Sequence, residues 1–394
     1  MATTYLLVTI INNSLITTAM SKTTKLLLII IILQTLAIVS LIYTIIVIRI
    51  FSNETLKNNL SNYIQEEQDE SNEIAEEKVN LSTNIAATIV WWDQDNGFES
   101  IKNYSKYIDS VSPFWYELNM NEEISPFSGA EDTEIKSYFE LNNIKILPII
   151  SNEFEREPLA SIIADTEKKQ KHINDILVIA NQYDGVSLNY ENLNEEDKDN
   201  YSQFIIELAN SLHENNKLLG IHLHAKNEEP GTWNGPKAQD WETLGGVCDK
   251  MKIMAYDYHW STSEAGAIAP PDWVEEVIQH ARELIPNEKI YLGIPLYGYD
   301  WISEEGEGIT YEEAVNISEL NNVQIEIDSS TNSPFFTYTD NEDNFHEVWF
   351  ENSQSTSSKL NIVQEYEIGG IDFYRLGGED KKMWGEVEKQ FTLE

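Results

Sequence analysis

Hydrophobic and polar positions follow two different periods along most of the chain after residue 84. Short runs rich in β-branched and aromatic residues, typical of buried strands, recur eight times. In chain order the runs are IAATIVWWD, YIDSVSPFWYEL, IKILPIIS, YDGVSLNYEN, LLGIHLHA, DKMKIMAYDYHW, KIYLGIPLYGYDW and IGGIDFYRLGGED. The segments between them, such as DKDNYSQFIIELANSLHENN and PPDWVEEVIQHARELIPNE, place apolar residues at helical spacing with polar ones opposite. The pattern predicts eight strands that alternate with helices.

This alternation is typical of the closed (β/α)8 TIM barrel, an α/β fold. A doubly wound open sheet is the alternative, but no glycine-rich phosphate loop follows the first run. The interval between the seventh and eighth runs is too long for one helix. Within residues 302–362 lie the strand-like runs VQIEIDSS and SPFFTYTD. We therefore expect a barrel over residues 86–394 with a small insertion at 302–362, between strands 7 and 8.

A longer apolar run lies near the N-terminus, at residues 26–48. As a helix rising 1.5 Å per residue, it exceeds the ~30 Å hydrocarbon core of a bilayer. It is longer than the apolar region of a signal peptide and has no small-residue cleavage site at its end, so it is typical of an uncleaved transmembrane signal anchor. Residues 1–25 are then an N-terminal cytoplasmic segment, with translation starting at Met1 or at Met20. Basic residues flank the run evenly and do not fix its orientation.

Acidic residues dominate the composition. The chain has 67 Asp and Glu against 26 Lys and Arg, a net charge of −41, which would repel nucleic acid. Residues 49–85 are rich in glutamate and poor in apolar side chains, so we expect them to form a solvated acidic tether. A single cysteine, Cys248, excludes an intrachain disulfide and a cysteine-cluster metal site.

Candidate chemistry collects at the ends of the predicted strands, where barrels carry their catalytic groups. In the fourth run the period of two places Ser187, Asn189 and Glu191 on one face, with Val186 and Leu188 on the other. Because the apolar face must meet the helices, Glu191 points into the barrel mouth. Burying a carboxylate is costly unless it is paired or protonated. From the residues alone, a catalytic glutamate and a salt-bridged structural glutamate are both open.

Four motifs carry a resemblance to a known family. The run YDGVSLNYE at 183–191 resembles the strand-four signature of glycoside hydrolase family 18, Asp-Gly-x-x-x-Asp-x-Glu. MAYD at 254–257, GIPLYGYDW at 293–301 and GGIDFYRLGGED at 369–380 resemble the sixth, seventh and eighth strands of that family. The resemblance covers nearly all of residues 86–394, and YDYHW, IAPPDWV and HEVWF are most similar to its bacterial branch of spore-germination and cortex-lytic N-acetylglucosaminidases.

The resemblance implies substrate-assisted hydrolysis with retention of configuration. Glu191 would protonate the glycosidic oxygen while the sugar's own 2-acetamido oxygen attacks C1, so no enzyme nucleophile is needed. Tyr256 would hydrogen-bond the acetamide oxygen, and Asp257 would help to hold the distorted sugar. Tyr374, where the family usually has tryptophan, would form the floor of the central subsite by stacking on the sugar.

Asn189 departs from the family's pattern, in which this position is an aspartate that orients the acetamide and adds negative charge beside the oxazolinium. A unit charge ~4 Å away at an effective dielectric of about 20 is worth roughly 4 kcal/mol, of which only a part is specific to the transition state. At about 1.36 kcal/mol per decade, a loss of roughly two to three decades in rate is expected. An asparagine amide still forms hydrogen bonds, so binding should survive better than turnover.

Further aromatic side chains are candidates for the walls of a glycan cleft. Each of them is equally interpretable as core packing, because aromatic residues also fill barrels. These candidates are Trp92, Trp115, Trp233, Tyr297 and Trp301.

Two alternatives to a hydrolase of this family stay open. A glycan-binding, lectin-like barrel without turnover is favoured at Asn189 and Ser187 and opposed at Glu191, Tyr256 and Asp257. A metal-dependent hydrolase would use His222 and His224 on one face of strand five, together with Asp257 and His259. His-x-His on a strand is more often barrel filling, so we expect neither a metal nor a cofactor.

The sequence therefore predicts a monomeric glycosidase of the N-acetylglucosaminidase or chitinase type. Its partners would be an N-acetylated glycan, peptidoglycan or chitin-like, and the membrane through one N-terminal helix. We expect it at the cell membrane as a single-pass protein with its catalytic domain outside the cytoplasm, since glycans of this class lie there.

Overall fold

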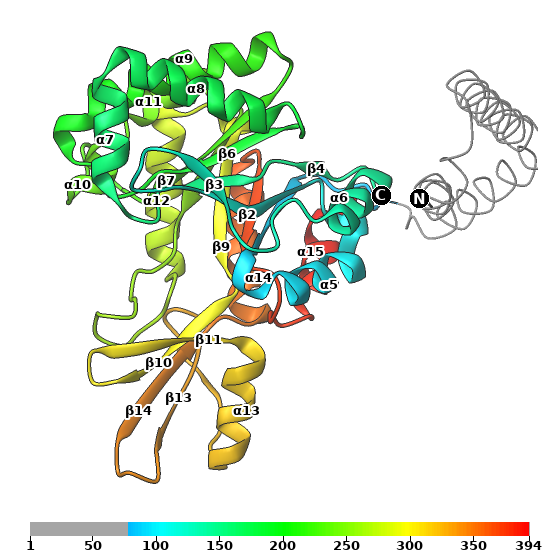
Figure 1. Ribbon diagram of the computed structural model, residues 1–394. Helices are drawn as coiled ribbons and strands as arrows, with labels where there is room; N and C mark the ends of the chain where they lie inside the picture. The colour runs from blue at the N-terminus through cyan, green and yellow to red at the C-terminus, as the bar shows by residue number, and fades with distance from the viewer. Residues whose placement is uncertain (1–77, 394) are drawn as a thin grey trace, which may run out of the picture. The chain divides into compact units, whose positions relative to one another are not determined.

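Each of the eight hydrophobic runs forms one parallel strand of a closed barrel in the computed structural model, which describes residues 78–393 (Figure 1). The order around the barrel is β1-β15-β9-β8-β7-β6-β5-β2, and β2 pairs again with β1. The strands are β1 (Asn84–Val90), β2 (Ser110–Leu118), β5 (Ile149–Ser151), β6 (Gly185–Asn189), β7 (Leu218–His224), β8 (Lys250–Met254), β9 (Ile290–Pro295) and β15 (Gly370–Tyr374). The predicted (β/α)8 barrel is confirmed. Two short strands extend it, β3 (Ile124–Pro126) antiparallel to β2 and β4 (Lys145–Ile146) parallel to β2.

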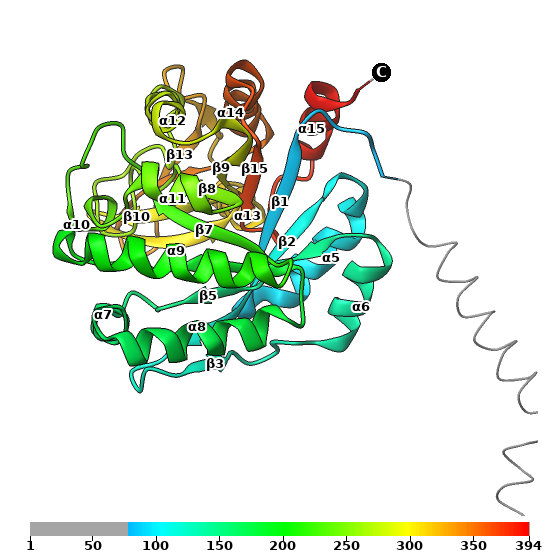
Figure 2. The same cartoon turned by 90° about the horizontal axis from the view of Figure 1, so that it is seen from above.

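Amphipathic helices surround the ring of strands, as Figure 2 shows from above. They form because apolar residues recur at helical spacing, and each buries that stripe against the strands. In α9 the buried positions include Tyr201, Phe204, Ile205, Leu208 and Leu212. The helices are α5 (Gln94–Tyr104), α6 (Thr133–Leu141), α7 (Arg156–Ala164), α8 (Thr166–Ala180), α9 (Lys198–Glu214), α10 (Asn234–Lys237), α11 (Trp241–Val247), α12 (Pro271–Leu284), α14 (Ser353–Tyr366) and α15 (Met383–Phe391).

The inside of the barrel holds a buried ion pair. Lys252 Nζ on β8 lies 3.0 Å from Asp372 Oδ1 on β15, and it also donates a hydrogen bond to Ser112 Oγ at 2.7 Å. Both charged side chains are almost completely buried. A buried charge is tolerated only when it is paired and hydrogen-bonded, which these contacts provide.

The insertion is a five-stranded antiparallel sheet below the barrel in Figure 1, in the order β11-β10-β14-β13-β12. Its elements are β10 (Tyr297–Ile302), β11 (Glu305–Thr310), α13 (Tyr311–Asn321), β12 (Glu326–Ile327), β13 (Pro334–Thr339) and β14 (Phe345–Phe350). The sheet therefore occupies 297–350 instead of the expected 302–362. The run at 293–301 is continuously apolar and aromatic and does not reveal the break after Pro295, and the segment after Phe350 forms the barrel helix α14.

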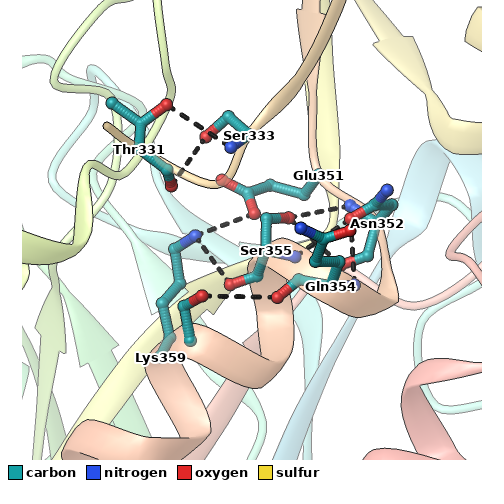
Figure 3. Close-up of polar contacts among 8 residues, drawn as sticks. Thr331, Ser333, Glu351, Asn352, Gln354, Ser355 and Lys359 are labelled. Carbon is teal, nitrogen blue, oxygen red and sulfur yellow. Dashed lines mark hydrogen bonds and ion pairs between the residues drawn. The ribbon is translucent and has the colours of Figure 1, made fainter. Parts of the chain in front are cut away.

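A second buried ion pair joins the last strand of the insertion to the barrel helix that follows it (Figure 3). Lys359 Nζ of α14 lies 2.8 Å from Glu351 Oε2, just after β14, and donates a second hydrogen bond to Ser355 O at 3.3 Å. The Glu351 and Lys359 side chains are each only 1% exposed. The Glu351 backbone N–H also donates to Tyr297 O at 3.1 Å, at the start of the insertion. The two ends of the insertion are thus fastened to each other and to α14.

The first described residues pack against the barrel. Leu81 forms an antiparallel bridge with Thr392, and the Ser82 backbone N–H donates to Phe391 O at 2.7 Å. Residues 78–85 therefore belong to the barrel and not to the predicted tether. Within residues 78–393, no helix is long and apolar enough to cross a membrane. The predicted anchor at 26–48 lies outside the described residues, as does most of the tether.

Candidate active site

Glu191 lies just past the carboxyl end of β6, and only 13% of its side chain is exposed. Its Oε1 accepts a hydrogen bond of 2.9 Å from Asn189 Nδ2. Burial raises the pKa of Glu191 to about 7, the amide of Asn189 opposes this increase, and the charges of Asp257 and Glu153 add to it. A carboxyl group with such a pKa is partly protonated at neutral pH, which suits a group that must both donate and accept a proton.

The backbone of Glu191 is held from both sides by one buried side chain. Asn152, which follows β5, accepts a hydrogen bond from the Glu191 N–H at 2.8 Å and donates one to the Glu191 carbonyl oxygen at 2.9 Å. Asn152 Nδ2 also reaches Glu155 O at 3.0 Å. The position of the candidate acid is therefore fixed by the loop after the neighbouring strand, and a fixed acid loses little entropy when substrate binds.

Tyr256, Asp257 and Tyr374 surround the same point from the ends of β8 and β15. The Tyr256 and Tyr374 rings stack with centroids 5.4 Å apart and an interplanar angle of 14°. Asp257 Oδ1 accepts hydrogen bonds from Tyr297 OH at 2.5 Å and Tyr299 OH at 3.1 Å. Burial raises the pKa of the Asp257 carboxyl group, and these two hydroxyls partly offset the increase.

Glu191, Asp257 and Tyr256 lie close enough for the charge of one to shift the pKa of another. The charge of Asp257 raises the pKa of Glu191, and the charges of Asp257 and Glu191 both help to raise the pKa of Tyr256, whose main cause is burial. The structure therefore brings together the four residues predicted to be catalytic, which are Glu191, Asn189, Tyr256 and Asp257. Their catalytic roles stay predictions.

Asn189 has an unused acceptor. Its Nδ2 donates to Glu191, while its buried Oδ1 has no hydrogen-bond partner in the described part of the chain. The buried Ser187 hydroxyl two residues earlier is also unpaired there. An unpaired buried acceptor beside the acid is costly in the free protein and is available to a ligand N–H.

The histidines of β7 do not form a metal centre with their neighbours. His224 Nε2 lies 3.8 Å from Glu191 Oε2, but burial lowers the pKa of His224 to about 4, so the ring is neutral there. Burial and the nearby Lys252 ammonium hold the pKa of His222 well below its usual range. Across residues 78–393, no three His, Cys, Asp or Glu side chains are grouped to hold a metal ion. The metal-dependent alternative therefore has no ligand set in this region.

Three cavities follow one another along the barrel mouth. Asp257 lines a cavity of about 820 Å³ and also a middle cavity of about 280 Å³. Trp92 and Arg375 line the middle cavity and also a third cavity of about 680 Å³. Space for a polymer therefore extends to both sides of Asp257. A cleft of this kind can accept an extended glycan.

Four of the six predicted substrate-binding aromatics line these cavities. Trp92 and Trp233 are 52% and 46% exposed, and both are available for stacking on a sugar. Tyr297 and Tyr374 are half-buried in the wall of the middle cavity.

The prediction for Trp115 and Trp301 as cleft walls is wrong. Trp115 is completely buried, and its Nε1 donates to Gln94 Oε1 of α5 at 2.6 Å. Trp301 is 1% exposed, because the loop after β8 covers it. Its Nε1 donates a hydrogen bond of 3.2 Å to Trp260 O in that loop. Both side chains fill the core.

Sequence reasoning missed three residues that the structure places at the cleft. Tyr299 binds Asp257, Trp349 of the insertion lines the cavity of about 820 Å³, and the charge of Glu153 helps to raise the pKa of Glu191. Glu153 could have been found, because it follows the third hydrophobic run and therefore lies at the same end of the barrel. Nothing in the sequence indicates how the insertion folds back to place Trp349.

Comparisons with known proteins agree with this geometry. The family description "Glycosyl hydrolases family 18" matches residues 59–379. The cortical fragment-lytic enzyme of Bacillus subtilis strain 168 is 28% identical over 313 residues, which cover 76% of this chain and 72% of that enzyme. The cortical fragment-lytic enzyme of Bacillus anthracis is 31% identical over 263 residues, covering 64% of this chain and 61% of the relative.

Solved structures share the fold. The spore cortex-lytic enzyme SleL of Bacillus cereus superposes with a TM-score of 0.72 at 24% identity, covering 79% of this chain and 75% of that one. A chitinase from Chromobacterium violaceum gives a TM-score of 0.73 at 23% identity, covering 78% of this chain and 98% of that one. The resemblance carried by the four strand motifs is confirmed.

Proposed function

The chain belongs to glycosyl hydrolase family 18, and we propose that this glycosidase cleaves N-acetylglucosamine-containing glycans by a substrate-assisted retaining mechanism with Glu191 as its acid and base. The observation that carries the proposal is the buried Glu191 carboxyl group, whose pKa burial raises to about 7, next to the free Oδ1 of Asn189. A group of this kind is protonated often enough to protonate a leaving oxygen and can then act as a base.

The first step breaks the glycosidic bond. Glu191 gives its proton to the glycosidic oxygen. At the same time, the acetamide oxygen of the sugar that carries C1 forms a bond to that C1, and the bond between C1 and the glycosidic oxygen breaks. The leaving sugar departs as an alcohol and a cyclic oxazolinium remains. Tyr256 donates its phenolic hydrogen bond to the acetamide oxygen, and Asn189 Oδ1 accepts one from the acetamide N–H. In the second step Glu191 removes a proton from water, which attacks C1 and reopens the ring.

The glycan most compatible with the relatives is peptidoglycan, with chitin-like chains as the second choice. Two of the relatives are named cortical fragment-lytic enzymes, and the cavities on both sides of Asp257 leave space for an extended chain. We further infer that residues 26–48 anchor the protein in the cell membrane with the barrel outside the cytoplasm, an inference supported by the length and apolarity of that run.

A direct assay tests the proposal. The full chain and its Glu191→Gln variant are incubated with peptidoglycan and with N-acetylglucosamine oligomers, and new reducing ends are measured. We expect release by the unaltered chain and a loss of at least about 10³-fold in the variant, because both steps need a proton carrier at this position. Equal product from the two proteins would remove Glu191 from the mechanism.

A glycan-binding protein without turnover is the second candidate, favoured by the missing charge at Asn189. It predicts that calorimetry detects binding of the same oligomers although no reducing ends appear. Turnover that depends on Glu191 excludes it.

A further inference from the structure

A second glutamate approaches the site from the neighbouring strand. Three adjacent strands are in register at the barrel mouth: Glu117 of β2 pairs with Ser151 of β5, which pairs with Asn189 of β6. Glu153 stands two residues after Ser151, as Glu191 stands two residues after Asn189. In parallel strands with matched register, these two glutamates leave the barrel side by side.

Hydrogen bonds tie the two segments together on both sides of Glu153. Asn152 holds the Glu191 backbone through its N–H and its carbonyl oxygen, and Asn192 Nδ2 donates to Phe154 O at 3.3 Å. The residue between Asn152 and Phe154 is Glu153, so its Cα is held beside the candidate acid.

The loop adopts an unfavourable backbone to achieve this. Glu153 and Phe154 both lie in the left-handed region, with φ of 46° and 64°. For residues with a side chain this conformation is unfavourable, because Cβ comes too close to the backbone. Ser151 Oγ stabilises the turn by accepting a hydrogen bond from the Glu153 N–H at 2.8 Å. Two consecutive strained residues are retained at a site where their geometry is needed.

The charge of Glu153 acts on residues of the site. Its charge helps to raise the pKa of both Glu191 and Tyr374, the floor residue of the cleft. Partial desolvation raises the pKa of Glu153 itself, with Ser151 opposing the change and Glu117 adding to it. The residue is nevertheless exposed, so a bound glycan can reach it.

We propose that Glu153 supplies, from β5, the negative charge beside the reacting centre that Asn189 does not supply from β6. The inference rests on the proposed function. Glu153 stays ionised and forms no covalent bond; it stabilises the positive charge that develops on the oxazolinium and holds more of Glu191 in its protonated form. Electrostatic stabilisation of this kind depends on charge and position, not on the strand that carries the group.

The test compares Glu153→Gln with Glu155→Gln in the full chain. Glu155 lies in the same loop, and its charge is not among the causes that shift the pKa of Glu191, so it is the matched control. We expect Glu153→Gln to lower kcat by about 10- to 100-fold with KM changed less than about threefold, whereas Glu155→Gln leaves both within about twofold. Adding Asn189→Asp to Glu153→Gln should restore most of kcat, because the charge returns from the other strand.

The pH profile separates an electrostatic role from a structural one. The groups close to Glu191 are Tyr256 and Asp257 after β8, the neutral His224 on β7, Tyr374 on β15, Asn189 on β6 and Glu153 after β5. Removing the Glu153 charge lowers the pKa of Glu191, so the decline of kcat/KM at high pH should move to lower pH. Glu155→Gln should not move it.

The outcomes of this test and of the proposed function are distinguishable. Unchanged kcat and pH profile in Glu153→Gln, together with an inactive Glu191→Gln, overturn the inference and leave the proposed function intact. If the unaltered chain releases no product, the proposed function fails. Binding of a thiazoline analogue of the oxazolinium then decides the inference: affinity at least about tenfold lower in Glu153→Gln supports it, and equal affinity overturns it.

Discussion

In the proposed mechanism, Asn189 limits the chemistry that the site can perform. Its N–H group binds Glu191 Oε1 while its Oδ1 is unpaired within the described residues, so it offers hydrogen bonds but no charge. An aspartate there would accept the acetamide N–H as well and would add a negative charge beside the oxazolinium. We expect Asn189→Asp to raise kcat by on the order of 10²-fold, since part of a Coulomb energy of a few kcal/mol is specific to the transition state. Steady-state rates on N-acetylglucosamine oligomers measure it.

The control combines the two positions. Glu191→Gln with Asn189→Asp should stay as inactive as Glu191→Gln alone, because the added charge cannot replace the proton donor. If Asn189→Asp leaves kcat unchanged both in the unaltered chain and in Glu153→Gln, the missing charge is not what limits this site.

The protonation of Glu191 sets the pH dependence of activity. Burial raises its pKa from the usual value near 4.5 to about 7, with Asn189 opposing and the charges of Asp257 and Glu153 adding. The first step needs the protonated form, so kcat/KM should be nearly constant below pH 6 and fall about tenfold per unit above roughly pH 8. A profile that keeps rising above pH 8 would contradict the assignment of Glu191 as the acid.

At the scale of elements, the sequence was sufficient to predict the barrel but not the bounds of the insertion. The eight runs identify the strands because buried parallel strands need continuous apolar and β-branched residues. The run KIYLGIPLYGYDW conceals two strands, because the barrel strand β9 and the insertion strand β10 are separated only by Leu296, which is itself buried.

The same limit applies to single side chains. The period of two places Glu191 at the barrel mouth, because Val186 and Leu188 require the other face. It cannot decide whether Trp115 or Trp301 lines the cleft, since that depends on which loop covers each ring. Trp301 is covered by the loop after β8, whose path the sequence does not specify.

The junction between the insertion and the barrel depends on the buried pair of Glu351 and Lys359 (Figure 3). Removing one partner leaves the other charge buried without compensation. We expect Lys359→Ala to lower the free energy of unfolding by about 3–5 kcal/mol in urea denaturation. Lys381→Ala is the control, because Lys381 is 67% exposed in its contact with Glu312 and should change stability by less than about 1 kcal/mol. Equal effects of the two substitutions would show that the buried pair does not fasten the insertion.

At the scale of the whole molecule, the acidic charge and the apolar run at residues 26–48 have opposite affinities for a membrane. The chain carries a net charge of −41, which keeps it away from anionic lipid headgroups, yet residues 26–48 form an apolar run longer than a bilayer core requires. The barrel has its own core and is complete within residues 78–393. Attachment to the membrane should therefore depend on the apolar run alone and not on the charged surface of the barrel.

Deleting residues 1–48 tests this division. We expect the full chain to sediment with membranes and to resist extraction by high salt and by alkaline carbonate, because a spanning helix is held by apolar burial and not by charge. The shortened chain should stay in the supernatant and keep the kcat of the full chain within about twofold, since every residue assigned to the site lies within the described residues 78–393. A full chain that salt alone releases would show that residues 26–48 do not span the bilayer. A shortened chain that folds but loses turnover would show that the N-terminal region contributes to the active site.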